Sequence, residues 1–393
     1  MAKYRLLAAR ATDFKLRGEI PFSNMTFSNV LNDAGTISVT IPLLSADIVP
    51  AGYVTPAQTT LWVERDGVLV WGGIVWTTNV DLISETIQVS GEGFFSYYKH
   101  RINGINFDTG AIVPGIPEGD ITYIMWQFLR TLTEDMTAGG TIVDPAWGYP
   151  YAPISGVPPI DTSGWYSEAA AGGFGWNVRN KWPVEEYKTH ADIIKSMCAG
   201  EYTSTTNADG TNHNCDFAII PAWDTVNNKP SVRWAFWDNK RGYTINTPLT
   251  MDGGVTSLGI TYDASDQANK AYVLGTSGEL PPRASYARGR EGNAIFMEKT
   301  FSENLDSDAL CLLYAKKASK VFNANHVIPE IELRGDNPVW DWTYYDVGDT
   351  FPIDVTAGFV DLDATWRIVE KVTTVSDSGT ETVRISVADD LLF

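Results

Sequence analysis

Residues 60–75 read TLWVERDGVLVWGGIV, and this stretch determines how the first part of the chain folds. Two runs rich in β-branched and aromatic residues flank Asp66-Gly67, and an Asp-Gly pair between such runs is a strong signal for a β-hairpin. Gly72 and Gly73 interrupt the second run, where glycine indicates a bulge or a sharp bend. The stretch therefore predicts a tight hairpin whose second strand bends.

Further β-strands are predicted around this hairpin. Residues 36–41 alternate between apolar and polar side chains before Pro42, and residues 86–90 form another candidate strand. Such short strands, crowded into the first hundred residues, predict a small barrel or a sandwich. Later in the chain, strand patterns return at residues 216–237, 365–375 and 380–388.

Three helices are predicted from apolar residues that recur at helical spacing. The first covers residues 121–132 and follows Asp120, a residue type favoured at N-caps. The second covers residues 189–199, with Thr189 as its N-cap, and the third covers residues 307–322.

Residues 137–183 have no periodic pattern and are rich in glycine, proline and aromatic residues. A segment of this length without a pattern is unusual inside a compact domain, so we expect a functional loop or an excursion held by its own aromatic side chains. Tryptophan and tyrosine are favoured where one protein contacts another. The candidate contacts to a partner or a glycan are Trp147, Tyr149, Tyr151, Trp165 and Trp176.

The composition bounds the class of protein. A chain of 393 residues corresponds to two to four domains. Its net charge of −19 argues against binding to nucleic acid or to an anionic membrane, both of which need clustered Lys and Arg. Solubility is the plainer reason for such a charge. In a protein that lines a DNA conduit, the same charge would keep DNA from adhering.

The cysteines and the apolar runs indicate where the protein is made. Three cysteines, Cys198, Cys215 and Cys311, do not make a disulfide framework, so we expect folding in a reducing cytoplasm. The apolar run at residues 6–9 is too short for the core of a signal peptide, and no run approaches the ~20 residues that span a bilayer. The sequence therefore predicts cytoplasmic synthesis without a membrane anchor.

Motifs of enzymes and cofactor sites are scarce in the sequence. It contains no GxxxxGK[ST], HExxH or GxSxG pattern. Ser96 and Lys99 fit SxxK, but the motif follows a β run and has no KTG or SDN partner, so packing is the plainer interpretation. Acidic pairs arise by chance among 48 Asp and Glu, and none is identified as a glycosidase pair.

A metal site could be imagined at Cys198, His213 and Cys215. Structural zinc needs four ligands, usually in paired spacing such as CxxC, and the sequence lacks that spacing. We expect Cys198 to pack on the apolar face of its helix and the other two to lie in a polar loop. We therefore predict no catalytic, cofactor-binding or metal-ligating residue, and no cofactor.

One pattern occurs twice in the chain. Residues 73–90 and 367–386 each contain a short apolar run, a Thr-Thr pair, a polar turn and a closing pentad, TIQVS in the first and TVRIS in the second. Convergent β patterning can produce such an echo by chance. Two copies of one barrel in a single chain would also produce it.

Both ends of the chain resemble one family. The hairpin at 60–75 is similar to the N-terminal signature of the tail hub proteins, usually labelled minor tail proteins, of siphophages of actinobacteria. Residues 34–42, where small residues lead into an alternating strand, are also similar to theirs. So is YDVGDTF at 345–351, followed by the Trp366 strand and the closing hairpin. The resemblance does not extend to residues 105–215.

The resemblance implies a multidomain α+β fold that is mainly β, with two tube-like β-barrel domains and inserted α/β segments. The hubs of contractile-tailed phages and the spikes of type VI secretion share this fold. The implied domains are residues 1–104 as the first part of the first barrel, 105–215 as an inserted α/β domain with the long aromatic loop, 216–250 as the return to the first barrel, and 251–393 as the second barrel with an inserted helix at 307–322.

The resemblance also implies a role. The chain would be a non-enzymatic hub that closes the tail tube at its tip, a homotrimer whose six barrels adapt a six-fold tube to a three-fold tip. Its partners would be the distal tail protein, the tape measure protein and other tail-tip or fibre proteins. DNA would pass through the lumen without specific binding. The protein would be part of the virion, made in the host cytoplasm.

Two other functions stay open on the sequence. The chain could be a glycan-binding or glycan-cleaving tail-tip protein that uses the aromatic residues of 137–183 as its platform. In that case, Trp147→Ala or Trp176→Ala would remove sugar binding. It could also be a free-standing acidic hydrolase unrelated to phages, for which the sequence identifies no carboxylate pair.

Overall fold

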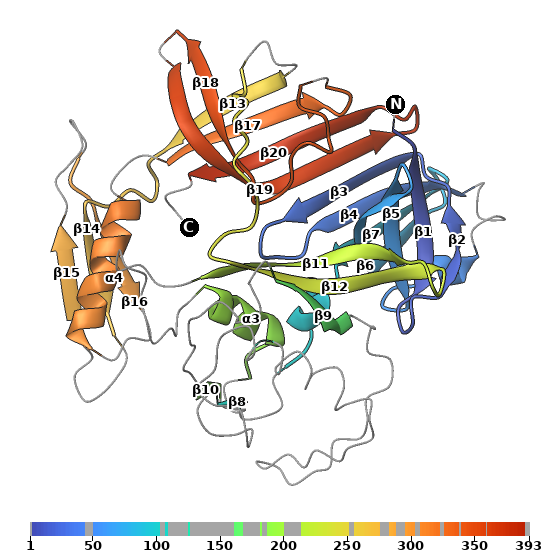
Figure 1. Cartoon of the computed structure of the whole chain (residues 1–393), viewed down its shortest axis with the longest axis horizontal. Coiled ribbons are helices and arrows are strands. Elements are labelled where there is room, and N and C mark those ends of the chain that lie inside the picture. Colours follow the sequence, from blue (N-terminus) through green and yellow to red (C-terminus); the bar gives the residue numbers. More distant parts are fainter. Residues whose placement is uncertain are drawn as a thin grey trace.

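The structure is a computed structural model in which β-strands dominate (Figure 1). The predicted mainly β fold is therefore confirmed. The described residues are 2–43, 50–102, 107–108, 125, 161–167, 181–182, 187–199, 214–250, 255–275, 283–287, 295–302, 307–322, 326–337, 339–358 and 360–389.

Twelve strands form one large sheet. Seven come from the N-terminal part of the chain: β1 (Tyr4–Arg10), β2 (Leu16–Ile20), β3 (Asn24–Val30), β4 (Thr36–Pro42), β5 (Thr59–Arg65), β6 (Val68–Asp81) and β7 (Thr86–Gly93). Five come from the C-terminal part: β13 (Val255–Asp263), β17 (His326–Arg334), β18 (Thr350–Ala357), β19 (Val360–Ser376) and β20 (Glu381–Asp389). The strand order is β13-β17-β20-β19-β3-β4-β7-β6-β5-β1-β2, and β18 also pairs with β19.

The predicted hairpin at 60–75 is confirmed as β5 and β6. Its turn residues have positive φ, 51° at Asp66 and 87° at Gly67, as a tight two-residue hairpin turn requires. The bulge predicted at Gly72-Gly73 is displaced: both glycines pair in register with Trp62 and Leu61, and the irregularities of β6 lie on either side of them, opposite Val63–Glu64 and between Val75 and Thr77. The closing hairpin is also confirmed, as β19 and β20.

The large sheet contains the same five-strand unit twice. Unit 1 has the spatial order β3-β4-β7-β6-β5, and unit 2 has the order β13-β17-β20-β19-β18. If the five strands of a unit are numbered along the chain, their order across the sheet is 1-2-5-4-3 in both units. All neighbouring strands in this order are antiparallel. Unit 1 joins unit 2 where β3 pairs with β19 along seven residue pairs.

The two closing pentads occupy equivalent positions in these units. Ser90 pairs with Thr77 directly after the irregularity in β6, and Ser386 pairs with Glu370 directly after the irregularity in β19. The sequence echo therefore coincides with a repeated unit. Among the described residues the sheet path is open, from β13 to β2, and neither unit closes into a barrel.

Three smaller sheets accompany the large one. β11 (Cys215–Asp224) and β12 (Lys229–Asp238) form a hairpin that pairs with β9 (Asp161–Ser167). The other sheets are β14 (Lys270–Leu274) with β15 (Arg283–Ala287) and β16 (Glu298–Ser302), and β8 (Phe107–Asp108) with β10 (Lys181–Trp182). Residues 216–250 were expected to return to the first barrel. They contain this hairpin and a later segment in which Thr244 and Leu249 form isolated β-bridges to β18.

The described helices are α1 (Phe95–Lys99), α3 (His190–Cys198) and α4 (Asp308–Val321), with the 3-10 turn η2 (Ala51–Tyr53). α3 and α4 confirm the helices predicted at 189–199 and 307–322. Thr189 caps α3 as predicted, because its Oγ1 accepts a hydrogen bond of 3.1 Å from the Asp192 amide. The helix predicted at 121–132 falls outside the described residues apart from Met125, which is helical and buried.

Apolar side chains pack on both faces of the N-terminal part of the large sheet. Leu6 and Ala8 of β1 face a core that continues under unit 2, whereas Leu7 and Ala9 face a second core. This alternation follows from the two-residue period of a strand. The β11–β12 hairpin, α1 and α3 cover the second core, and Figure 1 shows β11 and β12 crossing below the large sheet. Because β1 is buried on both faces, its residues Leu6–Ala9 form a continuous apolar run.

Gly73→Ala is expected to destabilise the fold by about 1–3 kcal/mol, because a side chain there overpacks the sheet. A Cβ atom on Gly73 would lie 2.3 Å from the Glu92 carbonyl oxygen. Gly259 in β13 provides the matched control, since its nearest neighbour would lie 3.9 Å away. Urea unfolding of both alanine variants tests this. Equal losses in the two variants would contradict it.

Candidate functional site

Of the aromatic residues singled out in the sequence, only Trp165 lies in the described part of the chain. Trp147, Tyr149, Tyr151 and Trp176 lie outside the described residues. Trp165 belongs to β9, which pairs in parallel with β12. The segment 137–183 therefore contains two strands, β9 and β10, where the sequence indicated only a loop. Its role in contacting a partner or a glycan stays a prediction.

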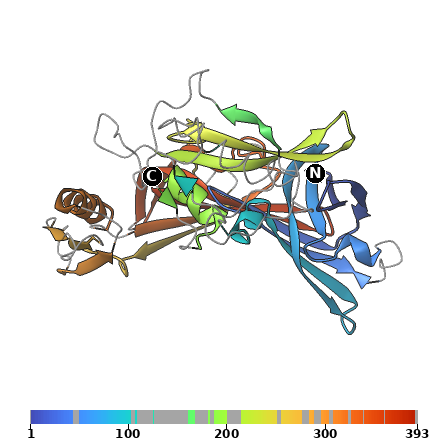
Figure 2. The ribbon, with the colours of Figure 1, turned by 90° about the horizontal axis from the view of Figure 1, so that it is seen from below.

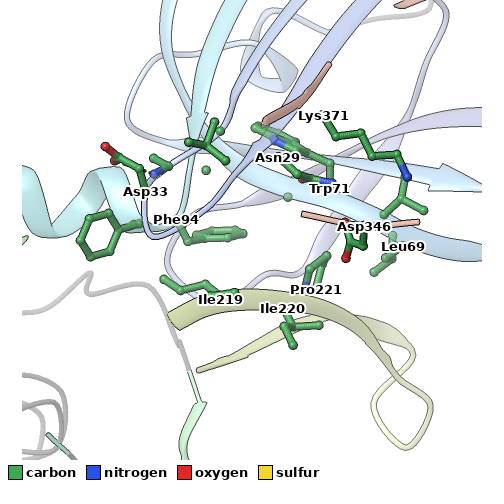
Figure 3. A pocket seen from close by; sticks show the side chains of 18 of the residues that line it. Asn29, Asp33, Leu69, Trp71, Phe94, Ile219, Ile220, Pro221, Asp346 and Lys371 are labelled. Atoms are coloured by element: carbon green, nitrogen blue, oxygen red, sulfur yellow. Dashed lines mark hydrogen bonds between the residues drawn. The ribbon is translucent and has the colours of Figure 1, made fainter. Parts of the chain in front are cut away.

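A cavity of about 380 Å³ lies where unit 1, unit 2 and the β11–β12 hairpin meet (Figure 3). Its floor comes from unit 1, including Trp71, and from Lys371 of β19 in unit 2. Its cover comes from Ile219, Ile220 and Pro221 of β11, as Figure 3 shows. Because it spans all three parts of the fold, we call this region the junction.

A buried ion pair anchors the hairpin at the junction. Asp216 of β11 binds Arg367 of β19, and the side chains are 5% and 1% exposed. The Asp216 carboxylate also accepts hydrogen bonds from Asn32 Nδ2 at 2.7 Å and from the Arg241 amide at 2.5 Å. Arg367 donates in addition to the Gly348 carbonyl oxygen at 3.2 Å. The hairpin, unit 1 and unit 2 are thus joined through one carboxylate.

Lys371 is the second buried charge of the junction. Its Nζ donates to the carbonyl oxygens of Trp342 and Tyr345 at 2.7 and 2.8 Å. It also lies 3.7 Å from the centroid of the Trp342 ring and 4.5 Å from that of Tyr345. Burial lowers the pKa of Lys371 to about 8, although nearby carboxylates such as Asp346 oppose the shift. The ammonium group therefore holds the 342–345 segment against β19.

Stability is expected to rise with pH through the titration of Lys371. Its folded-state pKa of about 8 lies below the ordinary value of 10.5, so the unfolded chain binds more protons between these values. The free energy of unfolding should increase by about 2 kcal/mol more in the wild type than in Lys371→Met between about pH 8 and 10. Urea unfolding across that range measures it.

Comparing the wild type with Lys371→Met also cancels the effect of other titrating groups on stability. Burial raises the pKa values of Tyr98 and Tyr345, which destabilises the folded state above about pH 10 in both proteins. These contributions cancel in the difference between the two proteins. Parallel pH profiles for the wild type and Lys371→Met would contradict the assignment.

Ser96 and Lys99, the residues of the SxxK motif, lie on the short helix α1, which the sequence did not predict. Their contacts agree with the interpretation that they serve packing. Ser96 is fully buried in α1, and its Oγ accepts a hydrogen bond of 3.0 Å from Trp76 Nε1. Lys99 pairs with Asp33 at 3.0 Å and with Glu92 at 3.5 Å. Both side chains are thus engaged in packing and ion pairing, and the lysine is not aimed at the serine.

The cysteines also differ in part from expectation. Cys198 packs on the buried face of α3, as predicted. Cys215 does not lie in a polar loop: it begins β11, is 3% exposed and contacts Cys198. It is buried because β11 starts at Cys215, one residue before the strand that the sequence predicted from residue 216. His213 falls outside the described residues. Over the described part of the chain, no three His, Cys, Asp or Glu side chains gather as a metal site would require.

The two buried charged groups of the junction, Asp216 and Lys371, are already engaged by hydrogen-bond partners within the protein. The Asp216 carboxylate has three donors, and Lys371 has two carbonyl acceptors and two rings. A general base or nucleophile needs a free lone pair within reach of a substrate. The arrangement is suited to holding three elements in fixed relation.

Comparisons with solved structures identify the fold. The chain superposes on the tail protein from Neisseria meningitidis MC58 with a TM-score of 0.55 and 11% identity, over 98% of this chain and 97% of that one. It superposes on the 43 kDa tail protein of prophage MuSo2 from Shewanella oneidensis with a TM-score of 0.58 and 11% identity, over 99% and 98%. This chain has the fold of phage tail proteins.

The same tail-protein fold extends to a larger assembly. A chain of the Francisella PdpA-VgrG complex matches with a TM-score of 0.52 and 8% identity, over 99% of this chain and 58% of that one. No family model and no curated protein matches the sequence. The link to siphophages of actinobacteria therefore stays a prediction. The helices described here include none long and apolar enough to cross a bilayer.

Proposed function

We propose that the chain is a structural component of a phage tail, namely the hub that closes the tail tube at its tip. Two lines of support exist for this role. The fold is that of phage tail proteins over nearly the whole chain. The buried charges of the described part are used in joining elements, which suits a structural and non-enzymatic protein.

The repeated five-strand unit carries the proposal. A six-fold tube needs six equivalent contacts at its end, whereas a three-fold tip offers three chains. A chain with two equivalent units resolves this mismatch, because three copies then present six units. The hub is accordingly a homotrimer in which each chain contributes unit 1 and unit 2.

The proposed partners follow from the position at the tip. The distal tail protein and the tape measure protein contact the hub, and other tail-tip or fibre proteins attach around it. DNA passes through the lumen of the ring without specific binding, and the net charge of −19 keeps its phosphates from adhering. The protein is thus part of the virion.

Electron microscopy of purified particles tests this role. An epitope tag is added to the chain and labelled with gold-conjugated antibody. Gold at the end of the tail distal to the capsid supports the hub. Gold on the capsid or along the tube, or its absence from particles that carry a tail, would contradict it.

A further inference from the structure

The two units differ in what covers one of their strands. In unit 2, β3 covers the outer edge of β19 from Glu370 to Ser376. In unit 1, β5 pairs with β6 only as far as Ile74. Among the described residues, no strand pairs with the outer edge of β6 at residues 77–81, although the segment before β5 reaches Thr78, whose Oγ1 donates to the Val54 carbonyl oxygen at 2.5 Å. Unit 1 thus has no partner strand along an edge whose equivalent in unit 2 is paired with β3.

A second open edge lies at the far end of the sheet. β13 is the unit 2 counterpart of β3, and it pairs with β17 on one side only. Figure 1 shows β13 toward the upper left of the large sheet and the β6–β7 hairpin toward its right. Figure 2 shows the β6–β7 hairpin projecting from the body of the molecule. One copy of the chain therefore carries both halves of the contact that joins β3 to β19.

We propose that β13 of one copy pairs antiparallel with residues 77–81 of β6 in the next copy. This inference rests on the proposed homotrimer and assigns the strands that form its interface. It repeats between copies the pairing that joins the two units within a copy. Such a head-to-tail contact is heterologous, and it closes into a ring when the rotation between units allows.

The internal pairing fixes the register of this contact. Leu258 lies opposite Ile331 in unit 2, just as Met25 lies opposite Val39 in unit 1. This equivalence places Ile260 at the position of Phe27, which pairs with Thr373. Matching the irregularities of β6 and β19 places Val80 at the position of Thr373. The expected pairs between copies are Ile260 with Val80, Thr261 with Asn79, and Tyr262 with Thr78.

This register matches side chains of like character. Val80 is 49% exposed in the single chain, and Ile260 lies opposite it. The next apolar position on the same face pairs Leu258 with Leu82, which is 75% exposed at the tip of the hairpin. Cross-strand apolar pairs stabilise a sheet by about 0.2–1 kcal/mol each. The equivalent tip of unit 2, residues 376–379, is polar.

The two edges also lack the devices that keep an edge unpaired. Exposed edge strands are usually protected by lysine, proline or inward-pointing charges. Residues 77–81 read TTNVD and β13 reads VTSLGITYD, so each has a single aspartate at its end and neither contains lysine, arginine or proline. β2, at the other end of the sheet, carries Arg17 and Glu19. The edge at β2 thus carries a basic residue, which the two edges that the proposal joins lack.

Cysteine cross-linking tests the contact on the full chain. Two double variants are made, Thr261→Cys with Asn79→Cys and Ile260→Cys with Val80→Cys, and each is oxidised with copper–phenanthroline. Since the two kinds of antiparallel pair alternate, one of these neighbouring pairs has the closer spacing, with Cα atoms about 4.5 Å apart. The native cysteines are buried, so the wild type controls for background.

The expected result is a ladder that ends at a covalent trimer on a non-reducing gel, for at least one double variant. A register control, Thr261→Cys with Asp81→Cys, should cross-link at least tenfold more slowly. If a trimer forms by solution mass but neither pair cross-links, the assigned interface is wrong and the hub proposal stands. If the chain stays monomeric at every attainable concentration and neither pair cross-links, the interface is also wrong.

Charge substitution gives an independent readout. Val80→Asp is expected to abolish self-association while leaving the circular dichroism spectrum unchanged, because Val80 is half exposed in the single chain. Adding Ile260→Lys should restore the oligomer, since the two charges would face each other across the interface. Unchanged solution mass in Val80→Asp would overturn the proposal. Gold labelling of particles reports on the hub role separately.

Discussion

Replacing Asp216 with alanine is expected to lower the free energy of unfolding by about 3–5 kcal/mol, because it leaves Arg367 buried without its counter-ion. The Arg367 side chain is 1% exposed, so water cannot replace the lost carboxylate. The substitution also leaves Asn32 Nδ2 and the Arg241 amide without their acceptor. Urea unfolding followed by tryptophan fluorescence measures the loss.

Two further variants separate this effect from the mere loss of a charge. Arg334→Ala removes a pair with Asp336 whose side chains are 65% and 59% exposed, and it should change stability by about 0–1 kcal/mol. Arg367→Met in the Asp216→Ala background should recover part of the loss, because no buried charge is then left unpaired. A loss in Asp216→Ala no larger than that in Arg334→Ala would show that the junction does not depend on this pair.

Trp62→Ala is expected to destabilise the chain by about 3–5 kcal/mol, the usual loss for a large aromatic side chain deleted from a core. Trp62 in β5 is fully buried, and its ring centroid lies 5.1 Å from that of Phe14 and 5.0 Å from that of Phe94. These three rings fill the space between unit 1 and the elements that cover its second face. The loss of the Trp62 ring should also weaken the packing of α1, because Phe94 is the residue directly before this helix.

Val68→Ala is the matched control for Trp62→Ala. Val68 belongs to the same hairpin but is 63% exposed, so its truncation should change stability by less than about 0.5 kcal/mol. Denaturant unfolding of both variants gives the difference. Similar midpoints for Trp62→Ala and the wild type would mean that the second core contributes little to the stability of unit 1.

Local sequence signals were sufficient to predict the elements that begin or turn at a characteristic residue. Asp66-Gly67 predicted the first hairpin, and the structure places both residues at positive φ. Thr189 predicted the start of α3, where its side chain caps the helix. Such signals depend on a few neighbouring residues, which is why a single sequence carries them.

The junction could not be predicted, because its partners are far apart in the chain. Asp216 and Arg367 are separated by 151 positions, and nothing local distinguishes Asp216 from other acidic residues. Lys371 did give a signal: it shares strand parity with Thr373 and Val375, so it falls on the buried face of β19. An inward-pointing lysine in an otherwise regular strand marks a buried polar contact, although it does not name the acceptors.

The repeated unit was visible in the sequence only in part. The pentads TIQVS and TVRIS are equivalent in the structure, whereas the Thr-Thr pairs are displaced from each other along β6 and β19. Sheet pairing conserves alternation and turn position while allowing residues to change, so strand order reveals the repeat better than residue identity. The repeated unit is also what connects the fold to the proposed role at a symmetry mismatch.

Single-particle electron microscopy of the purified chain, with its solution mass taken alongside, tests the hub most directly. A three-fold ring with an open channel and six similar units around it is the expected result. A particle of any other symmetry, or a ring whose units do not alternate between unit 1 and unit 2, would contradict the proposed hub.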